Sequence, residues 1–241
     1  MNNIVFKNVR LETGFEYDEE GEISGTKTDL FCVEITNDTI SNILPNDPHS
    51  NALDAQNMLM LPAFKDMHVH LDKTLYGLTW KAVPSKKRTV KDMIALEQRI
   101  IPELLNTSIT RSEQLIELLQ SYGISYARSH FNIDPTSGLR SLEHLETVLQ
   151  NKKDSFSAEL VAFPQHGIFY TKTKPLIKEV AQFKSVGFIG GLDPTTIDGS
   201  IEKPIDFIVE LALEHGKGID IHLHEIGATG FKTIDYIVDK V

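Results

Sequence analysis

Apolar and polar positions follow two different patterns along this chain of 241 residues. In the first 60 residues, short runs of apolar and β-branched side chains are separated by Gly, Asp and Asn, which is typical of strands joined by turns. These runs are residues 4–12, 29–36, 39–45 and 52–62. The acidic stretch 16–29 is predicted to be an exposed loop. We therefore expect residues 1–60 to form a small β domain.

Beyond Pro62, apolar runs alternate with amphipathic stretches. The strand candidates are residues 63–71, 123–133, 158–166, 186–192 and 218–226. Between them, apolar side chains recur at the i, i+3 and i+4 spacing of helices, as in Leu142, Leu145, Val148 and Leu149. The same spacing predicts helices over 113–123, 175–183, 204–216 and 233–241. Two of these stretches end in Gly123 and Gly216, where helix C-caps are expected.

From the second strand candidate onward, strands recur about every 30 residues, the length of a βαβ unit. Near-continuous apolar strands joined by helices indicate a parallel sheet. Residues 61–241 are therefore predicted to form an α/β domain with five strand–helix units, either part of a (β/α) barrel or a doubly wound sheet. A nucleotide-binding sheet is disfavoured, because no GxGxxG or GxxxxGK[ST] loop joins a strand to a helix.

Composition narrows the classes of partner. Asp and Glu outnumber Lys and Arg by 34 to 24, and this acidic balance makes nucleic acid an unexpected partner. The sequence contains no run of about 20 apolar residues, so no membrane span is expected. It starts without the features of a signal peptide, and its single cysteine, Cys32, fits a reducing compartment. A cytoplasmic location is expected, with Cys32 as a buried small apolar side chain.

Histidines mark the candidate chemistry. His68 and His70 lie two residues apart on the first strand after Pro62, so both imidazoles project to the same side. Two imidazoles at this spacing can bind one divalent ion. The alternative is a pair of hydrogen-bonded histidines beside a core. The strand at 218–226 adds His222 and His224, followed by Glu225.

A third imidazole would complete a site with an open position for water, and Glu225 could then move protons during hydrolysis. Only one of His222 and His224 is needed as a ligand. Zinc or iron is the expected ion, and sites of this kind also accept manganese.

Four strings resemble the amidohydrolase superfamily, specifically its cytosine-deaminase-like members. LPAFKDMHVHLDKT resembles the opening of the family's barrel and ARSHFNID its second-strand motif. VAFPQHGI resembles the third-strand motif, and IDIHLHEIG the fifth-strand motif with His–x–x–Glu. Their order and spacing agree with the family along the whole chain. The resemblance implies a TIM-type (β/α) barrel, preceded by the N-terminal part of a composite β-sandwich, and selects the barrel over the doubly wound sheet.

The resemblance also implies residue roles. His68, His70 and His222 look like metal ligands, and Glu225 like the general acid/base. Gln165 resembles the glutamine that binds the substrate's polar edge.

The resemblance gives the remaining residues supporting or open roles. Asp72 is expected to support the site or the fold, and His130 to support the site or pack beside it. His166 stands where relatives often carry Glu, so its role is open, and His224 is expected near the mouth. Trp80 is predicted either to line the substrate pocket or to pack.

The implied activity is metal-dependent hydrolysis of a non-peptide C–N bond in a small cyclic amide or amidine. Family members have eight barrel strands; this chain supplies about five and lacks the sixth-strand His and eighth-strand Asp. We therefore expect a truncated chain with little activity alone. The alternative is an inactive remnant, or a fragment that needs complementation by another chain. The resemblance also raises a homo-oligomer as a further expectation, while the substrate beyond a small nitrogen-containing molecule stays open.

Overall fold

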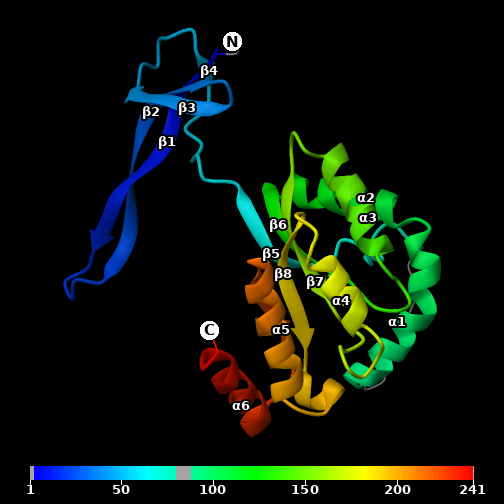
Figure 1. The fold of residues 1–241 in the computed structure, drawn as a ribbon. Helices are drawn as coiled ribbons and strands as arrows, with labels where there is room; N and C mark the ends of the chain where they lie inside the picture. Colours follow the sequence, from blue (N-terminus) through cyan, green and yellow to red (C-terminus); the bar gives the residue numbers. More distant parts are fainter. Residues whose placement is uncertain (1–2, 80–87, 241) are drawn as a thin grey trace. The chain divides into compact units, whose positions relative to one another are not determined.

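The computed structural model describes residues 3–79 and 88–240, so Trp80 lies outside the described residues. The chain divides into two compact units, Met1–Pro62 and Ala63–Val241. Each unit contains one sheet, and Figure 1 shows the strands of both. Within the described residues, no helix is both long and apolar enough to cross a membrane.

The first unit is a four-stranded sheet in the order β3-β2-β1-β4. Its strands are β1 (Asn3–Tyr17), β2 (Ile23–Thr36), β3 (Thr39–Pro45) and β4 (Leu53–Asp54). Val9, Cys32 and Val33 are its buried apolar side chains, so the expectation for Cys32 is confirmed. A second sheet stacked on this one, as in a sandwich, stays a prediction.

The prediction that residues 16–29 form an exposed loop was wrong. β1 and β2 continue as an antiparallel ladder, with Phe15 opposite Thr26 and Glu16 opposite Gly25. The turn is confined to residues 18–22, where Asp18 accepts hydrogen bonds from the backbone N–H groups of Glu20 and Glu22. Backbone pairing can extend through polar residues here because the side chains of this outer hairpin are largely exposed.

The second unit contains a five-stranded parallel sheet in the order β5-β6-β7-β8-β9. Its strands are β5 (Phe64–Val69), β6 (Ile124–Asn132), β7 (Ser157–Phe163), β8 (Val186–Leu192) and β9 (Gly218–His222), as the apolar runs predicted. Each strand pairs with its predecessor, without reversal. Because parallel crossovers are right-handed, this order places the helices on one face. Such a curled sheet is one part of a (β/α) barrel (Figure 1).

Six α-helices and one short π-helix occur among the described residues of this unit. They are α1 (Val90–Leu105), α2 (Ser108–Ser121), α3 (Arg140–Asn151), α4 (Lys174–Val180), η1 (Pro194–Asp198), α5 (Glu202–His215) and α6 (Gly227–Val238). Leu142, Leu145 and Val148 on α3 are fully buried, as their spacing predicted. Gly216 ends α5 with φ 62°, a conformation that glycine adopts without steric cost.

Helix α1 was not predicted. It begins with a capping box, in which the Thr89 side chain accepts from the Asp92 N–H and the Asp92 side chain accepts from the Thr89 N–H. Ile94, Ile101, Leu104 and Leu105 form its buried face.

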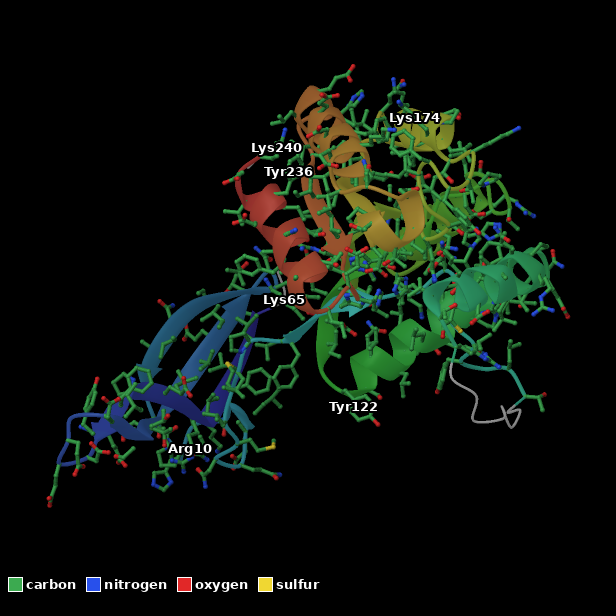
Figure 2. The ribbon with its side chains drawn as sticks, turned by 90° about the horizontal axis from the view of Figure 1, so that it is seen from below. Arg10, Lys65, Tyr122, Lys174, Tyr236 and Lys240 are labelled. Carbon is green, nitrogen blue, oxygen red and sulfur yellow. The ribbon has the colours of Figure 1, made fainter. Side chains whose placement is uncertain are left out.

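The last helix contacts α5 through a small polar cluster. The hydroxyl of Tyr236 donates to Asp206 Oδ1 at 2.9 Å, and Lys240 Nζ lies 2.8 Å from the same oxygen (Figure 2). These contacts lower the pKa of Asp206, mainly through the bonds from Lys240 and Tyr236. The other side of α6 carries exposed apolar side chains at Phe231, Ile234 and Val238.

Candidate metal centre

The structure brings His68, on β5, and His70, the residue after its end, together with His222, the last residue of β9. One ring nitrogen of each lies within 4.8 Å of the others. The ring centroids of His68 and His222 are 4.5 Å apart, and those of His70 and His222 are 5.3 Å apart. His68 and His70 present their rings on one side because alternate residues of an extended chain face the same way. Strand β9 reaches them because the sheet curls.

The imidazoles of His70 and His222 are held neutral. Burial, followed by the nearby charge of Lys73, lowers the pKa of His70 to about 2. Burial, followed by His130, lowers the pKa of His222 to about 3. Neutral imidazoles keep the lone pairs that a metal ion requires.

The hydrogen bonds of these two rings fit a metal ion. His70 Nδ1 lies 3.0 Å from the backbone oxygen of His130, which can only accept, so Nδ1 carries the proton and Nε2 carries a lone pair. That Nε2 faces His222 Nε2 at 3.4 Å, and the buried His222 Nδ1 has no hydrogen-bond partner among the described residues. An imidazole fixed by a backbone carbonyl on its far nitrogen is the usual state of a metal ligand. The donor set therefore fits a divalent cation.

Hydrogen bonds between side chains of β6 and β9 support the histidine cluster. His130 on β6 is fully buried, and its Nε2 lies 3.0 Å from Asp220 Oδ1. Arg128 donates to Asp220 Oδ2 at 3.1 Å and to Glu159. Burial opposes ionisation of Asp220, but His130 and Arg128 outweigh it and lower its pKa. His130, Asp220 and His222 form an alternative group of three potential ligands.

Gln165 and His166 meet acidic groups that sequence reasoning did not single out. Gln165 Nε2 donates to Glu97 Oε1 at 2.8 Å. His166 is fully buried, with Nδ1 3.2 Å from Asp134 Oδ1 and Nε2 3.8 Å from Glu97 Oε2. Lys73 Nζ contacts both oxygens of Glu97, at 3.2 and 3.3 Å. The open role of His166 is thus, structurally, that of a buried partner for two carboxylates.

Glu225 and His224 are organised by another buried carboxylate, Asp193. Its Oδ2 lies 2.9 Å from His224 Nδ1, and its Oδ1 accepts the backbone N–H of Glu225 at 3.2 Å. The carboxylate of Glu225 accepts from the Thr196 N–H at 2.6 Å and from Thr233 Oγ1 at 3.2 Å. Asp193 has φ 36°, a left-handed conformation at the entry to η1.

The nine predicted site residues therefore separate into groups. His68, His70, His222 and His130 cluster, whereas the His224 side chain is exposed and turned to Asp193. Asp72 is buried under the site, where Oδ2 accepts from the Asn132 N–H at 2.9 Å, and burial raises its pKa. Sequence reasoning missed a set of acidic partners whose importance arises from tertiary contacts: Glu97, Asp134, Asp193 and Asp220.

The buried pair of His166 and Asp134 predicts a pH-dependent contribution to stability. Burial opposes both charges, but mutual contact outweighs it: the pKa of Asp134 falls from 3.8 to about 2, and the pKa of His166 rises above 6.5. The contribution of Asp134 is complete above pH 3.8 and lost as pH falls towards 2. The contribution of His166 is complete below pH 6.5 and lost as pH rises through its folded pKa.

We expect His166→Gln to lower the free energy of unfolding by about 2 kcal/mol between pH 4 and 6.5, and by less outside this window. Urea unfolding at several pH values measures the difference. A destabilisation that stays constant from pH 4 to 9 would show that His166 acts through packing alone.

Comparisons with known proteins agree with this fold. No protein-family model matches the chain. The chain is 46% identical over 239 residues to YahJ, an uncharacterized protein of Escherichia coli (strain K12), covering 97% of this chain and 52% of YahJ. It is 25% identical over 195 residues to N-isopropylammelide isopropyl amidohydrolase of Pseudomonas sp. (strain ADP), covering 78% of this chain and 47% of that protein. The chain thus spans about half the length of these relatives.

Solved structures give the same picture. N-isopropylammelide isopropylaminohydrolase from Burkholderia multivorans ATCC 17616 superimposes with a TM-score of 0.81 at 26% identity, covering 100% of this chain and 57% of that one. The 5-methylcytosine deaminase from Klebsiella pneumoniae gives 0.75 at 24% identity, covering 98% and 55%, and shows the fold alone. The resemblance to the amidohydrolases of the cytosine-deaminase-like group is confirmed.

Proposed function

We propose that this chain provides the metal-binding part of a hydrolase that cleaves a non-peptide C–N bond in a small cyclic amide or amidine. The observation that carries the proposal is the convergence of His68, His70 and His222, in which the half-buried rings of His70 and His222 have lowered pKa values and are neutral. The named hydrolases among the similar proteins support the reaction class.

The residues of the chain then have distinct tasks. His68, His70 and His222 would hold one divalent ion, zinc or iron, which supplies a Lewis acid that activates water when bound. Glu225, with its carboxylate oriented by Thr196 and Thr233, moves protons to the leaving nitrogen.

Two further residues prepare the site. Gln165 binds the polar edge of the substrate. His130, fixed by Asp220, keeps the ring of His222 from turning: the two ring centroids lie 4.7 Å apart, nearly perpendicular.

The proposal also includes a complete barrel, of which the described five-stranded sheet is one part. The described sheet ends at β5 and β9, whose outer edges have no partner strand among the described residues. The similar proteins are about twice as long as the matched region. We propose that further strand–helix units, beyond those described, close the barrel, and that the chain alone hydrolyses slowly or not at all.

A chimera tests the proposal. This chain replaces the matching half of YahJ, and the hybrid is assayed for release of ammonia or amine from a panel of cyclic amides and amidines. We expect hydrolysis that stops on metal removal and falls at least about 100-fold in Glu225→Gln, since positioned acid/base groups contribute about 10²–10⁴-fold. Glu210→Gln, on the outer helix α5, is the matched control. A folded chimera whose hydrolysis survives both metal removal and Glu225→Gln would contradict the proposal.

A further inference from the structure

Arg128, on β6, contacts three other strands of the second sheet. Its Nε and Nη2 donate to Glu159 Oε2 on β7, at 3.0 and 2.9 Å. Its Nη1 donates to Asp220 Oδ2 on β9, at 3.1 Å. Its guanidinium carbon lies 4.0 Å from the centroid of the Phe188 ring on β8. One side chain therefore links four of the five strands.

The contact between Arg128 and Asp220 requires the sheet to curl. Strands β7 and β8 lie between β6 and β9. In a flat sheet, three strand spacings amount to about 14 Å, and side chains stand roughly perpendicular to the sheet, so these two could not meet. His130, a shorter side chain of β6, also reaches Asp220, at 3.0 Å. Both contacts therefore lie on the inside of a curled sheet.

The ring of Phe188 fixes where the guanidinium of Arg128 lies. Phe188 pairs with Gly218, the first residue of β9, and a Cβ at Gly218 would clash with the ring. The missing side chain lets the ring lie against the backbone of β9. An arginine stacks well on an aromatic face, so Arg128 is directed along this ring towards β9.

These side-chain contacts matter because the described sheet is open. In a closed barrel, the number and stagger of the hydrogen-bonded strands fix the curvature. Here the outer edges of β5 and β9 have no partner strand among the residues that the structure describes. Contacts across the inside of the curl must then hold it. The side chains of Arg128 and Asp220 are only 23% and 20% exposed, so their attraction is weakly screened.

The curl brings the metal ligands together. His222 follows Asp220 by two residues and lies on the same face of β9. His68 belongs to β5, at the opposite edge of the sheet, yet its ring centroid is 4.5 Å from that of His222. Whatever holds Asp220 against β6 therefore also holds His222 near the histidines of the other edge.

We propose that Arg128 is a positioning residue of the metal centre. By joining β6 to Asp220, it maintains the sheet curvature that brings His222 to His68 and His70. This inference rests on the proposed function, because it takes these three histidines as ligands of one ion.

Arg128→Met tests the inference on the full chain. We expect zinc affinity to fall by about 10–100-fold, as is usual when a residue that orients a metal ligand is lost. X-ray absorption of the zinc-loaded variant should show two imidazoles instead of three, because His68 and His70 lie on one segment and stay together. Thermal unfolding checks that the variant is folded.

Two matched controls accompany this variant. Glu159→Gln removes the other carboxylate beside Arg128 but leaves the contact with Asp220, and should keep zinc affinity within about fivefold. Arg99→Met makes the same change at an exposed position of α1 and should leave zinc affinity unaltered. A loss in either control as large as that in Arg128→Met would overturn the inference.

Asp220→Asn tests the same contact from the side of β9, and also serves if Arg128→Met does not fold. It should weaken zinc binding at least as much as Arg128→Met does. If Arg128 acts through Asp220, the double variant should bind zinc within about twofold of Asp220→Asn alone. Losses that multiply in the double variant would show that Arg128 acts by another route.

Nuclear magnetic resonance without metal separates this inference from the proposed function. We expect Overhauser effects between the ring protons of His68 and His222 in the wild type and in Glu159→Gln, and their loss in Arg128→Met. A wild type that shows these effects but binds no zinc contradicts the proposed function, while their loss in Arg128→Met still supports the role of Arg128 in the curvature. A folded Arg128→Met that keeps both these effects and the zinc affinity of the wild type overturns the inference and leaves the metal centre intact.

Discussion

Replacing His222 by alanine is expected to weaken zinc binding by at least about 100-fold. Loss of residues that merely orient metal ligands costs about 10–100-fold in affinity, and loss of a ligand should cost more. We expect this large loss of zinc affinity because the His222 ring lies against the rings of His68, His70 and His130. Competition with a chromophoric chelator at pH 7.5 measures the change.

His224→Ala is the matched control for this prediction. It lies two residues further along, is exposed, and is bound to Asp193 instead of the cluster. We expect its zinc affinity to stay within a few-fold of the wild type. If His224→Ala caused the larger loss, the ligand would be His224, and the assignment of His222 would be wrong.

Leu211→Ala is expected to destabilise the second unit by about 3–4 kcal/mol. Leu211 on α5 is 3% exposed and belongs to the main apolar core. Replacing a buried leucine by alanine removes its transfer free energy and leaves a cavity, at a total cost of about 2–5 kcal/mol. Urea unfolding followed by circular dichroism measures the loss.

Leu213→Ala controls for helix propensity, because it makes the same change on the same helix at a position that is 76% exposed. We expect this variant to differ from the wild type by about 0.5 kcal/mol or less. Similar destabilisation by both variants would mean that Leu213 is covered in solution and that the core does not distinguish the two faces of α5.

Local sequence patterns were sufficient to predict most of the strands and helices of the second unit. Each of the five apolar runs became a strand; β6, β7 and β8 have the buried apolar residues typical of a parallel sheet, whereas β5 is largely exposed. The spacing of His68 and His70 also predicted that their rings would lie on the same side of the chain. Helix α1 carried comparable signals, a capping box at Thr89 and an apolar face from Ile94 to Leu105, and could have been predicted from them.

The acidic partners of the site could not be found in this way. Glu97 lies on a helix and Asp134 in a loop, and in both settings a carboxylate is ordinarily solvated. Their burial follows from α1 and the loop after β6 meeting His166, which is a contact between residues far apart in the sequence. Asp220 could have been predicted from the sequence, because it precedes His222 by two residues and therefore lies on the same face of β9.

X-ray absorption spectroscopy at the zinc edge, on the chain loaded with one equivalent of zinc, tests the metal centre most directly. We expect three imidazole nitrogens at about 2.0–2.1 Å from the zinc, with one of them lost in His222→Ala. Zinc surrounded by oxygen ligands without imidazole scattering, or a spectrum unchanged by His222→Ala, would contradict a metal centre built from His68, His70 and His222.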